Sequence, residues 1–204
     1  MSIQDTSYKY NYLIPTEKLE FPVKVNVHFP CRGNFYFKSI ELNKKILEIT
    51  KSEVSFQASS FHIPHTTLYM GFVETFPNLM KTLEIVGEFA KAQKQLEIKL
   101  SKPYIKMPQN NWVFYDVMPV ETIKLIKSDL REKIGKYMAP LSWDVVAETP
   151  HITIGYVKSN QDQVNKLLEQ EQEGYIGTAE AVEVSFSGAR GTCLGSIRTY
   201  ELIK

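Results

Sequence analysis

Hydrophobic and polar residues follow two periods along this chain, and each period predicts one type of secondary structure. Val23, Val25 and Val27 alternate with polar side chains, as in a strand that is buried on one face. Further strands are predicted within residues 54–73, 96–100, 111–118, 143–157 and, as a final pair, 181–203. The third and fourth of these six segments flank a turn-rich stretch, so we expect them to form a hairpin.

The second period predicts four helices. It is most regular in residues 121–136, where Ile123, Ile126 and Leu130 recur on one helical face. Helices are also predicted in residues 38–52, after Pro77 and after Ser159.

The order of these elements is strand, helix, strand, helix, hairpin, helix, strand, helix, hairpin, and its two halves look alike. We therefore predict an α+β fold that is bilobal and duplicated about a pseudo-twofold axis. The chain has 204 residues and 23.5 kDa, which suits one domain of two intertwined lobes. Residues 1–20 show no convincing period and are expected to form an N-terminal arm.

Composition narrows the classes of partner. The 24 Lys and Arg against 23 Asp and Glu give a net charge of +1, so no broad basic field favours duplex DNA or an anionic membrane. Cys31 and Cys193 stand far apart and indicate neither a disulfide framework nor a zinc knuckle. No leader or membrane span is recognised. We therefore expect a cytoplasmic monomer.

One short motif occurs twice. Residues 64–68 and 150–154 both read Pro-His-x-Thr followed by a branched aliphatic residue, and their histidines are 86 positions apart. Thirteen threonines in the chain make the chance recurrence of this pattern at two of four histidines improbable. The repeat therefore indicates a duplicated functional element.

The spacing within the motif has a chemical meaning. Side chains two positions apart on a strand share a face, so His65 lies beside Thr67 and His151 lies beside Thr153. If the two halves are related by a pseudo-twofold axis, both pairs converge on one cleft that suits a phosphate. One histidine then accepts a proton from the attacking oxygen and the other donates one to the leaving oxygen. The threonine hydroxyls stabilise the charge that builds on phosphorus.

These motifs resemble the two-histidine phosphoesterase superfamily, which includes 2′-5′ RNA ligase-like and cyclic phosphodiesterases. The resemblance covers both motifs, their separation and the duplicated order of elements in residues 23–203, and it has no counterpart for the N-terminal arm. It places the catalytic pairs on His65 with Thr67 and His151 with Thr153. It also implies two antiparallel β-sheets that line a central cleft with helices outside, and metal-independent cleavage of phosphodiesters next to a ribose hydroxyl.

The sequence thus predicts a phosphodiesterase for RNA ends or small ribonucleotides that needs no cofactor. It leaves open whether a 2′,3′-cyclic phosphate is hydrolysed or a ribose hydroxyl attacks, and which histidine is the base. One alternative is a nuclease that degrades cyclic or 2′-5′-linked oligonucleotide signals, because near-neutral charge suits a short ligand. Another is a nucleotide- or RNA-binding module without catalysis, although such a module needs no pair of proton-transfer groups.

Three further residues are candidates for substrate binding. Tyr69 continues the face of His65 and is predicted to stack on a nucleobase. Trp143 is a second aromatic candidate, and Arg190 stands in a glycine-flanked turn where it would meet a phosphate. His62 precedes His65 by three positions, but without a third ligand the pair does not predict a metal site.

Overall fold

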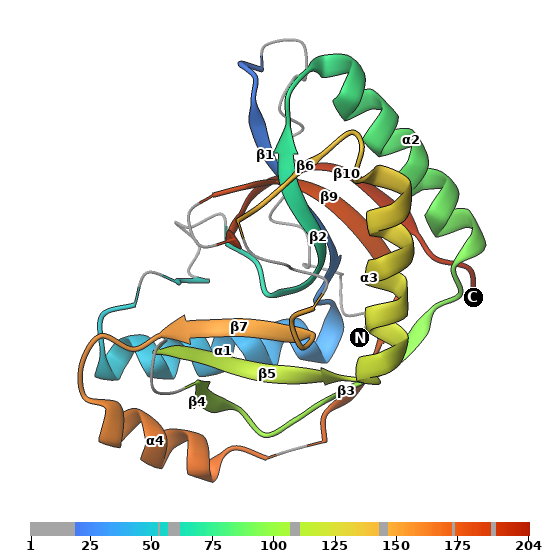
Figure 1. The fold of residues 1–204 in the computed structure, drawn as a ribbon. Helices are drawn as coiled ribbons and strands as arrows, with labels where there is room; N and C mark the ends of the chain where they lie inside the picture. Colours follow the sequence, from blue (N-terminus) through green and yellow to red (C-terminus); the bar gives the residue numbers. More distant parts are fainter. Residues whose placement is uncertain are drawn as a thin grey trace, which may run out of the picture.

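The computed structural model describes residues 19–52, 54–56, 62–106, 111–142, 147–172, 174–188 and 191–204 (Figure 1). Its helices are α1 (Gly33–Ile49), α2 (Phe76–Ala92), α3 (Val120–Ile134) and α4 (Gln161–Gln170). Its strands are β1 (Val23–Pro30), β2 (His65–Val73), β3 (Leu96–Leu100), β4 (Tyr104–Lys106), β5 (Trp112–Met118), β6 (Ala139–Pro140), β7 (His151–Tyr156), β8 (Ile176–Ala179), β9 (Ala181–Ser187) and β10 (Cys193–Glu201).

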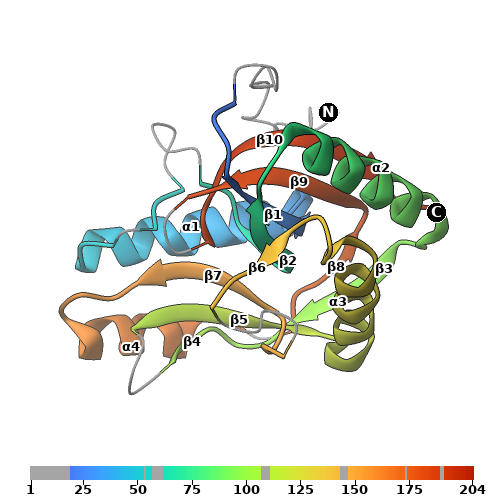
Figure 2. The same ribbon diagram turned by 45° about the horizontal axis from the view of Figure 1, so that its top comes forward.

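The strands of the described part pair antiparallel into one curled sheet. Its order is β10-β9-β1-β2-β7-β5-β3-β8, with β4 paired to β5 and β6 paired to β2. The first four strands of this path and the last four form two halves that meet where β2 pairs with β7 at Thr66 and Ile152. In Figures 1 and 2, β2 lies at the centre of the molecule and β7 runs below it.

The helices pack outside the sheet. α1 lies along β7, α2 packs against β9 and β10, and α3 packs against β2 and β5 (Figure 2). The apolar stripes predicted from the sequence face inward, since Leu42 and Ile46 of α1 and Leu130 of α3 are buried in one hydrophobic core. Thr75 caps the start of α2 by accepting a hydrogen bond from the Asn78 N–H.

The α+β class and the four helices are confirmed. The two separate sheets that were expected are instead joined into one sheet, because the motif strands β2 and β7 pair with each other. The strands β4, β6 and β8 were not predicted, since runs of two to four residues are too short to show a period. The strand predicted over residues 143–157 is shorter, spanning His151–Tyr156; residues 143–146 lie outside the described part. Across that part, the structure contains no helix with the length and apolar character of a membrane span.

Candidate active site

The pairing of β2 with β7 brings the two motifs together. Thr66 and Ile152 are each the middle residue of a His-x-Thr motif, and they lie directly opposite each other. In an antiparallel pair this register places His65 beside Thr153 and Thr67 beside His151. The sheet therefore relates the two motifs by a local twofold axis.

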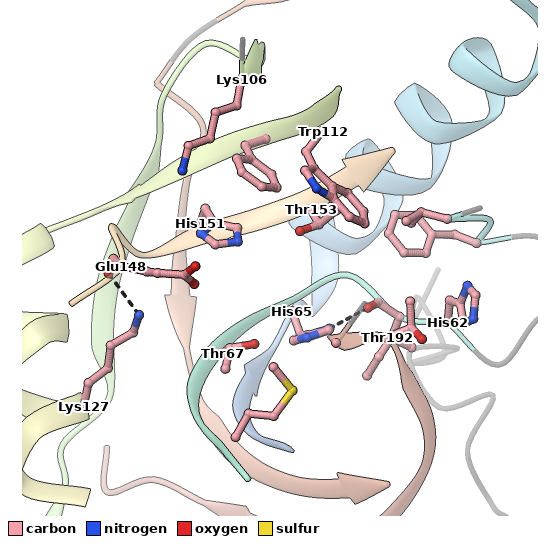
Figure 3. Close-up of a pocket in the computed structure, with 16 residues that line it drawn as sticks. His62, His65, Thr67, Lys106, Trp112, Lys127, Glu148, His151, Thr153 and Thr192 are labelled. Atoms are coloured by element: carbon pink, nitrogen blue, oxygen red, sulfur yellow. Dashed lines mark hydrogen bonds between the residues drawn. The ribbon is translucent and has the colours of Figure 1, made fainter. Parts of the chain in front are cut away.

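The four motif side chains share one face of this pair. Thr66 and Ile152 are 2% and 0% exposed and point into the protein, so the histidines and threonines on either side point the other way. All four line a cavity of about 390 Å³ (Figure 3). This volume lies within the usual range of sites for small molecules and cofactors.

Both imidazoles are held in the same way. The Nδ1 of His65 lies 2.8 Å from the carbonyl oxygen of Ile63, and the Nδ1 of His151 lies 2.9 Å from that of Thr149. Each carbonyl can only accept, so each Nδ1 carries a proton and donates it. The Nε2 atoms are then the ones left for acid-base chemistry.

The surroundings of His151 are aromatic and cationic. The Phe114 ring lies 4.1 Å from the imidazole between centroids. Burial lowers the pKa of His151 to about 4; the hydrogen bond to the Thr149 carbonyl opposes burial, and the charges of Lys127 and Lys106 act in the same direction as burial. His151 is therefore neutral near pH 7 and able to accept a proton.

The surroundings of His65 are polar and buried. The amide nitrogen of Asn26, on β1, donates to His65 Nε2 at 3.1 Å and to Thr67 Oγ1 at 3.2 Å. The Cys193 sulfur lies 3.4 Å from His65 Nδ1, and the His28 ring lies 4.7 Å from the His65 ring between centroids. The two histidines of the repeated motif thus stand in different electrostatic environments.

Sequence reasoning missed a cation in the wall of the cavity. Lys127 on α3 is 2% exposed, lines the cavity and donates from Nζ to the Glu148 carbonyl oxygen at 3.2 Å. Lys127 falls on the apolar stripe of this helix, next to Ile126. This position was a signal in the sequence, because a lysine on a buried helix face is rare and usually has a role.

Two aromatic residues of β5 also form part of this wall. The rings of Trp112 and Phe114 lie 6.4 Å apart at an interplanar angle of 10°, and both line the cavity. They are two positions apart on one strand, so the alternation of β5 presents both on the same face.

Tyr69 is not where the sequence indicated. It is 4% exposed in the main core and does not line the cavity. The register between β1 and β2 shifts between Val27 and His28, whose partners are Tyr69 and Thr67. Leu68 is the extra residue of this bulge, and it reverses the alternation. Met70 consequently lines the cavity in place of Tyr69, and we do not retain Tyr69 as a ligand contact.

The other expected ligand contacts remain predictions. Trp143 and Arg190 lie outside the described residues. His62 lines the cavity, yet within the described ranges no group of three or more His, Cys, Asp or Glu side chains is arranged to hold a metal ion.

Comparison with known proteins gives a family and a fold. Residues 41–188 match the family model of the 2′-5′ RNA ligase superfamily. A search of curated proteins found no match. Several solved structures have the same fold, including these three. A Thermus thermophilus protein, TT0787, has a TM-score of 0.65 at 13% identity, over 88% of this chain and 97% of that one. Escherichia coli LigT complexed with 3′-AMP has a TM-score of 0.62 at 13% identity, over 91% of this chain and 100% of that one. A protein described as a phosphoesterase has a TM-score of 0.60 at 14% identity, over 90% of this chain and 100% of that one.

Proposed function

The chain belongs to the 2′-5′ RNA ligase superfamily, and from this premise we propose that it is a metal-independent phosphodiesterase acting on RNA ends or small ribonucleotides. The observation that carries the proposal is the convergence of His65, Thr67, His151 and Thr153 on one cavity. Two imidazoles whose Nε2 atoms take part in proton transfer and two hydroxyls are the groups that such a reaction requires.

We assign the base to His151, because its lowered pKa keeps it neutral. His151 takes the proton of the attacking oxygen as that oxygen bonds to phosphorus. His65 gives a proton to the leaving oxygen as its bond to phosphorus breaks. The protein therefore accepts one proton and donates one in each reaction. Thr67 and Thr153 donate to the non-bridging oxygens as negative charge grows on them. A phosphate bound between the two motifs would lie close to His151, and its negative charge would raise the pKa of that residue.

Asn26 is suited to both protonation states of His65. Its Nδ2 donates to an unprotonated Nε2, while its Oδ1 has no hydrogen-bond partner within the described part of the chain. A half-turn of the amide presents Oδ1 to a protonated Nε2. The same side chain therefore supports His65 before and after the proton is lost.

A nucleotide is the substrate that the wall of the cavity favours. Trp112 and Phe114 offer a flat apolar surface on which a base stacks, and Lys106 and Lys127 add positive charge near the phosphate. Escherichia coli LigT, which has this fold, was crystallised with 3′-AMP. We propose that the nucleophile is either water, which opens a 2′,3′-cyclic phosphate, or a neighbouring ribose hydroxyl, which forms one.

The test is to incubate the purified protein in EDTA with 2′,3′-cyclic mononucleotides, 2′-5′ oligoadenylate and cyclic dinucleotides, and to identify products by mass. Turnover of cyclic mononucleotides is expected, with a bell-shaped pH dependence. Cleavage of oligonucleotides alone would favour the signal-degrading nuclease. Binding without any product would favour a binding module, and loss of turnover in EDTA would contradict the metal-free mechanism.

A further inference from the structure

A buried group of ionisable side chains lies against His65 and has no part in the mechanism above. It consists of His28 on β1, Glu183 on β9 and Cys193 on β10, which are 0%, 1% and 1% exposed. β1 and β9 pair with His28 opposite Glu183, and β10 pairs with β9 so that all three side chains meet. We call these three residues the Cys193 cluster.

The sulfur of Cys193 lies between two imidazoles. Its distances are 3.4 and 3.7 Å to the two ring nitrogens of His65, and 3.8 and 3.9 Å to those of His28. Because the sulfur is almost equally far from both nitrogens of each ring, no single nitrogen is its directed partner. Such a contact restricts rotation of the His65 ring, whose Nδ1 already donates to Ile63.

The cluster carries charge. Burial alone would lower the pKa of His28, but Cys193 and Glu183 outweigh it and raise the pKa to about 10. Burial alone would raise the pKa of Cys193, but His28 and His65 outweigh it and lower the pKa to about 5. Glu183 lies 3.5 Å from His28 Nε2 and accepts a hydrogen bond from Thr199 at 3.1 Å. Near neutral pH the cluster is therefore a thiolate, an imidazolium and a carboxylate, with one net negative charge.

Such a cluster is costly, since each buried ion loses its hydration. The same strands carry Val25, Val27, Val182 and Val184 on their other face, where apolar side chains fill the core. On β1 and β9, the buried ionisable residues His28 and Glu183 lie on the face toward His65, where the cluster presents negative charge, whereas Lys106 and Lys127 present positive charge to His151. The cluster therefore makes the two halves of the site electrostatically unlike.

We propose that Cys193, backed by the buried pair of His28 and Glu183, is a positioning residue that holds His65 in its reactive orientation in the proposed phosphodiester reaction. This inference rests on the proposed function, and it assigns no contact between Cys193 and substrate. It predicts that the thiol matters for turnover and not for substrate binding.

The chain offers a matched control, because its other cysteine, Cys31, is also buried and lies in the hydrophobic core. Cys193→Ala is expected to lower kcat about 10- to 100-fold with KM nearly unchanged, the usual size of effect when the support of an active-site group is lost. Cys193→Ser, which keeps a small polar group, recovers part of this loss. Glu183→Gln lowers kcat in the same sense, and Cys31→Ala leaves kcat unchanged.

A spectroscopic readout tests the cluster without substrate. A thiolate absorbs more strongly than a thiol in the ultraviolet, so we expect added absorbance that appears as the pH rises through about 5. This absorbance should persist in Cys31→Ala and be absent in Cys193→Ala. Thermal unfolding of each variant identifies any that fail to fold, and Cys193→Ser and Glu183→Gln then decide the question. Wild-type kcat in folded Cys193 and Glu183 variants would overturn the inference while the proposed function stands. A wild-type protein that turns over none of the substrates would remove both.

Discussion

Thr66 on β2 lies opposite Ile152 on β7, and each is the central residue of a Pro-His-x-Thr motif. This one pair joins the two halves of the sheet and fixes the register of the motifs. A slip of one residue would turn one motif's histidine and threonine away from the cavity, because strand side chains alternate. The active-site geometry therefore depends on this pairing.

A disulfide between these positions is the first prediction. Directly opposed residues of an antiparallel pair have Cα atoms about 4.5 to 5.5 Å apart, within the range of about 4.4 to 6.8 Å that a disulfide tolerates. We expect Thr66→Cys combined with Ile152→Cys to form the bond and to keep activity within about twofold, since both side chains point away from the cavity.

The measurement is a count of free thiols in denaturant. The two natural cysteines are free, so an oxidised double variant should show the same thiol content as the wild type. Each single Cys variant, which has no partner to pair with, should show one thiol more. An unoxidised double variant, or an oxidised one without activity, would contradict this register.

The sequence predicted the parts of this site that depend on local period. The motif repeat located four side chains, and alternation placed His65 with Thr67 on one face. Alternation failed at Tyr69, because the bulge at Leu68 depends on the neighbouring strand β1 and leaves no local mark. The Cys193 cluster was equally hidden, since it joins strands from opposite ends of the chain whose contact is set only by the folded sheet.

Removal of either motif histidine is the second prediction. His65→Ala and His151→Ala should each lower kcat at least about 100-fold, the contribution expected of a proton-transfer group. The double variant should lose little more than the worse single variant, because the two groups act in one step. Steady-state rates of the three variants, with circular dichroism to verify folding, test this. Losses that multiply in the double variant would show that the histidines act independently.

Trp112 is predicted to hold the nucleobase. Trp112→Ala should raise KM about 5- to 150-fold with a small change in kcat, which corresponds to about 1 to 3 kcal/mol for one stacked base. Trp112→Phe keeps an aromatic face and should recover most of the affinity. The control is Phe37→Ala on α1, a residue that is 47% exposed and does not line the cavity. An unchanged KM in Trp112→Ala would place the base elsewhere.

Lys127 is predicted to set the acid side of the pH profile. Its charge helps to lower the pKa of His151, and His151 must be unprotonated to act as the base. Lys127→Met should therefore raise the pKa of His151 and move the acid limb of the kcat/KM profile to higher pH. We also expect a loss of about 10- to 100-fold at neutral pH, because a positive charge near the phosphate is removed. Lys124→Met, on the same helix but 36% exposed and paired with Glu121, should change neither. An acid limb that stays in place would contradict the role assigned to Lys127.

The Cys193 cluster makes a prediction about stability and pH. The pKa of His28 is raised from 6.5 to about 10, so its contribution to the free energy of unfolding is complete below pH 6.5 and lost as the pH rises through 10. The pKa of Cys193 is lowered from 9.0 to about 5, so its contribution is complete above pH 9 and lost as the pH falls through 5. Between pH 6.5 and 9 the folded pair holds one proton on His28 and the unfolded pair holds one on Cys193. The two dependences cancel there.

The free energy of unfolding should therefore be level between about pH 6.5 and 9 as far as this pair determines it. It should fall below pH 6.5, where the unfolded chain binds the extra proton, and His151 adds to that fall because its pKa is also lowered. It should fall again above pH 9, where the folded state retains a proton that the unfolded chain has lost. Urea unfolding from about pH 5 to 10 measures the curve. Cys193→Ala removes the largest cause that raises the pKa of His28, so that pKa is no longer held near 10 and the fall above pH 9 should shrink. Cys31→Ala should keep the level region and the fall above pH 9. A fall above pH 9 that is unchanged in Cys193→Ala would show that His28 and Cys193 do not share a proton.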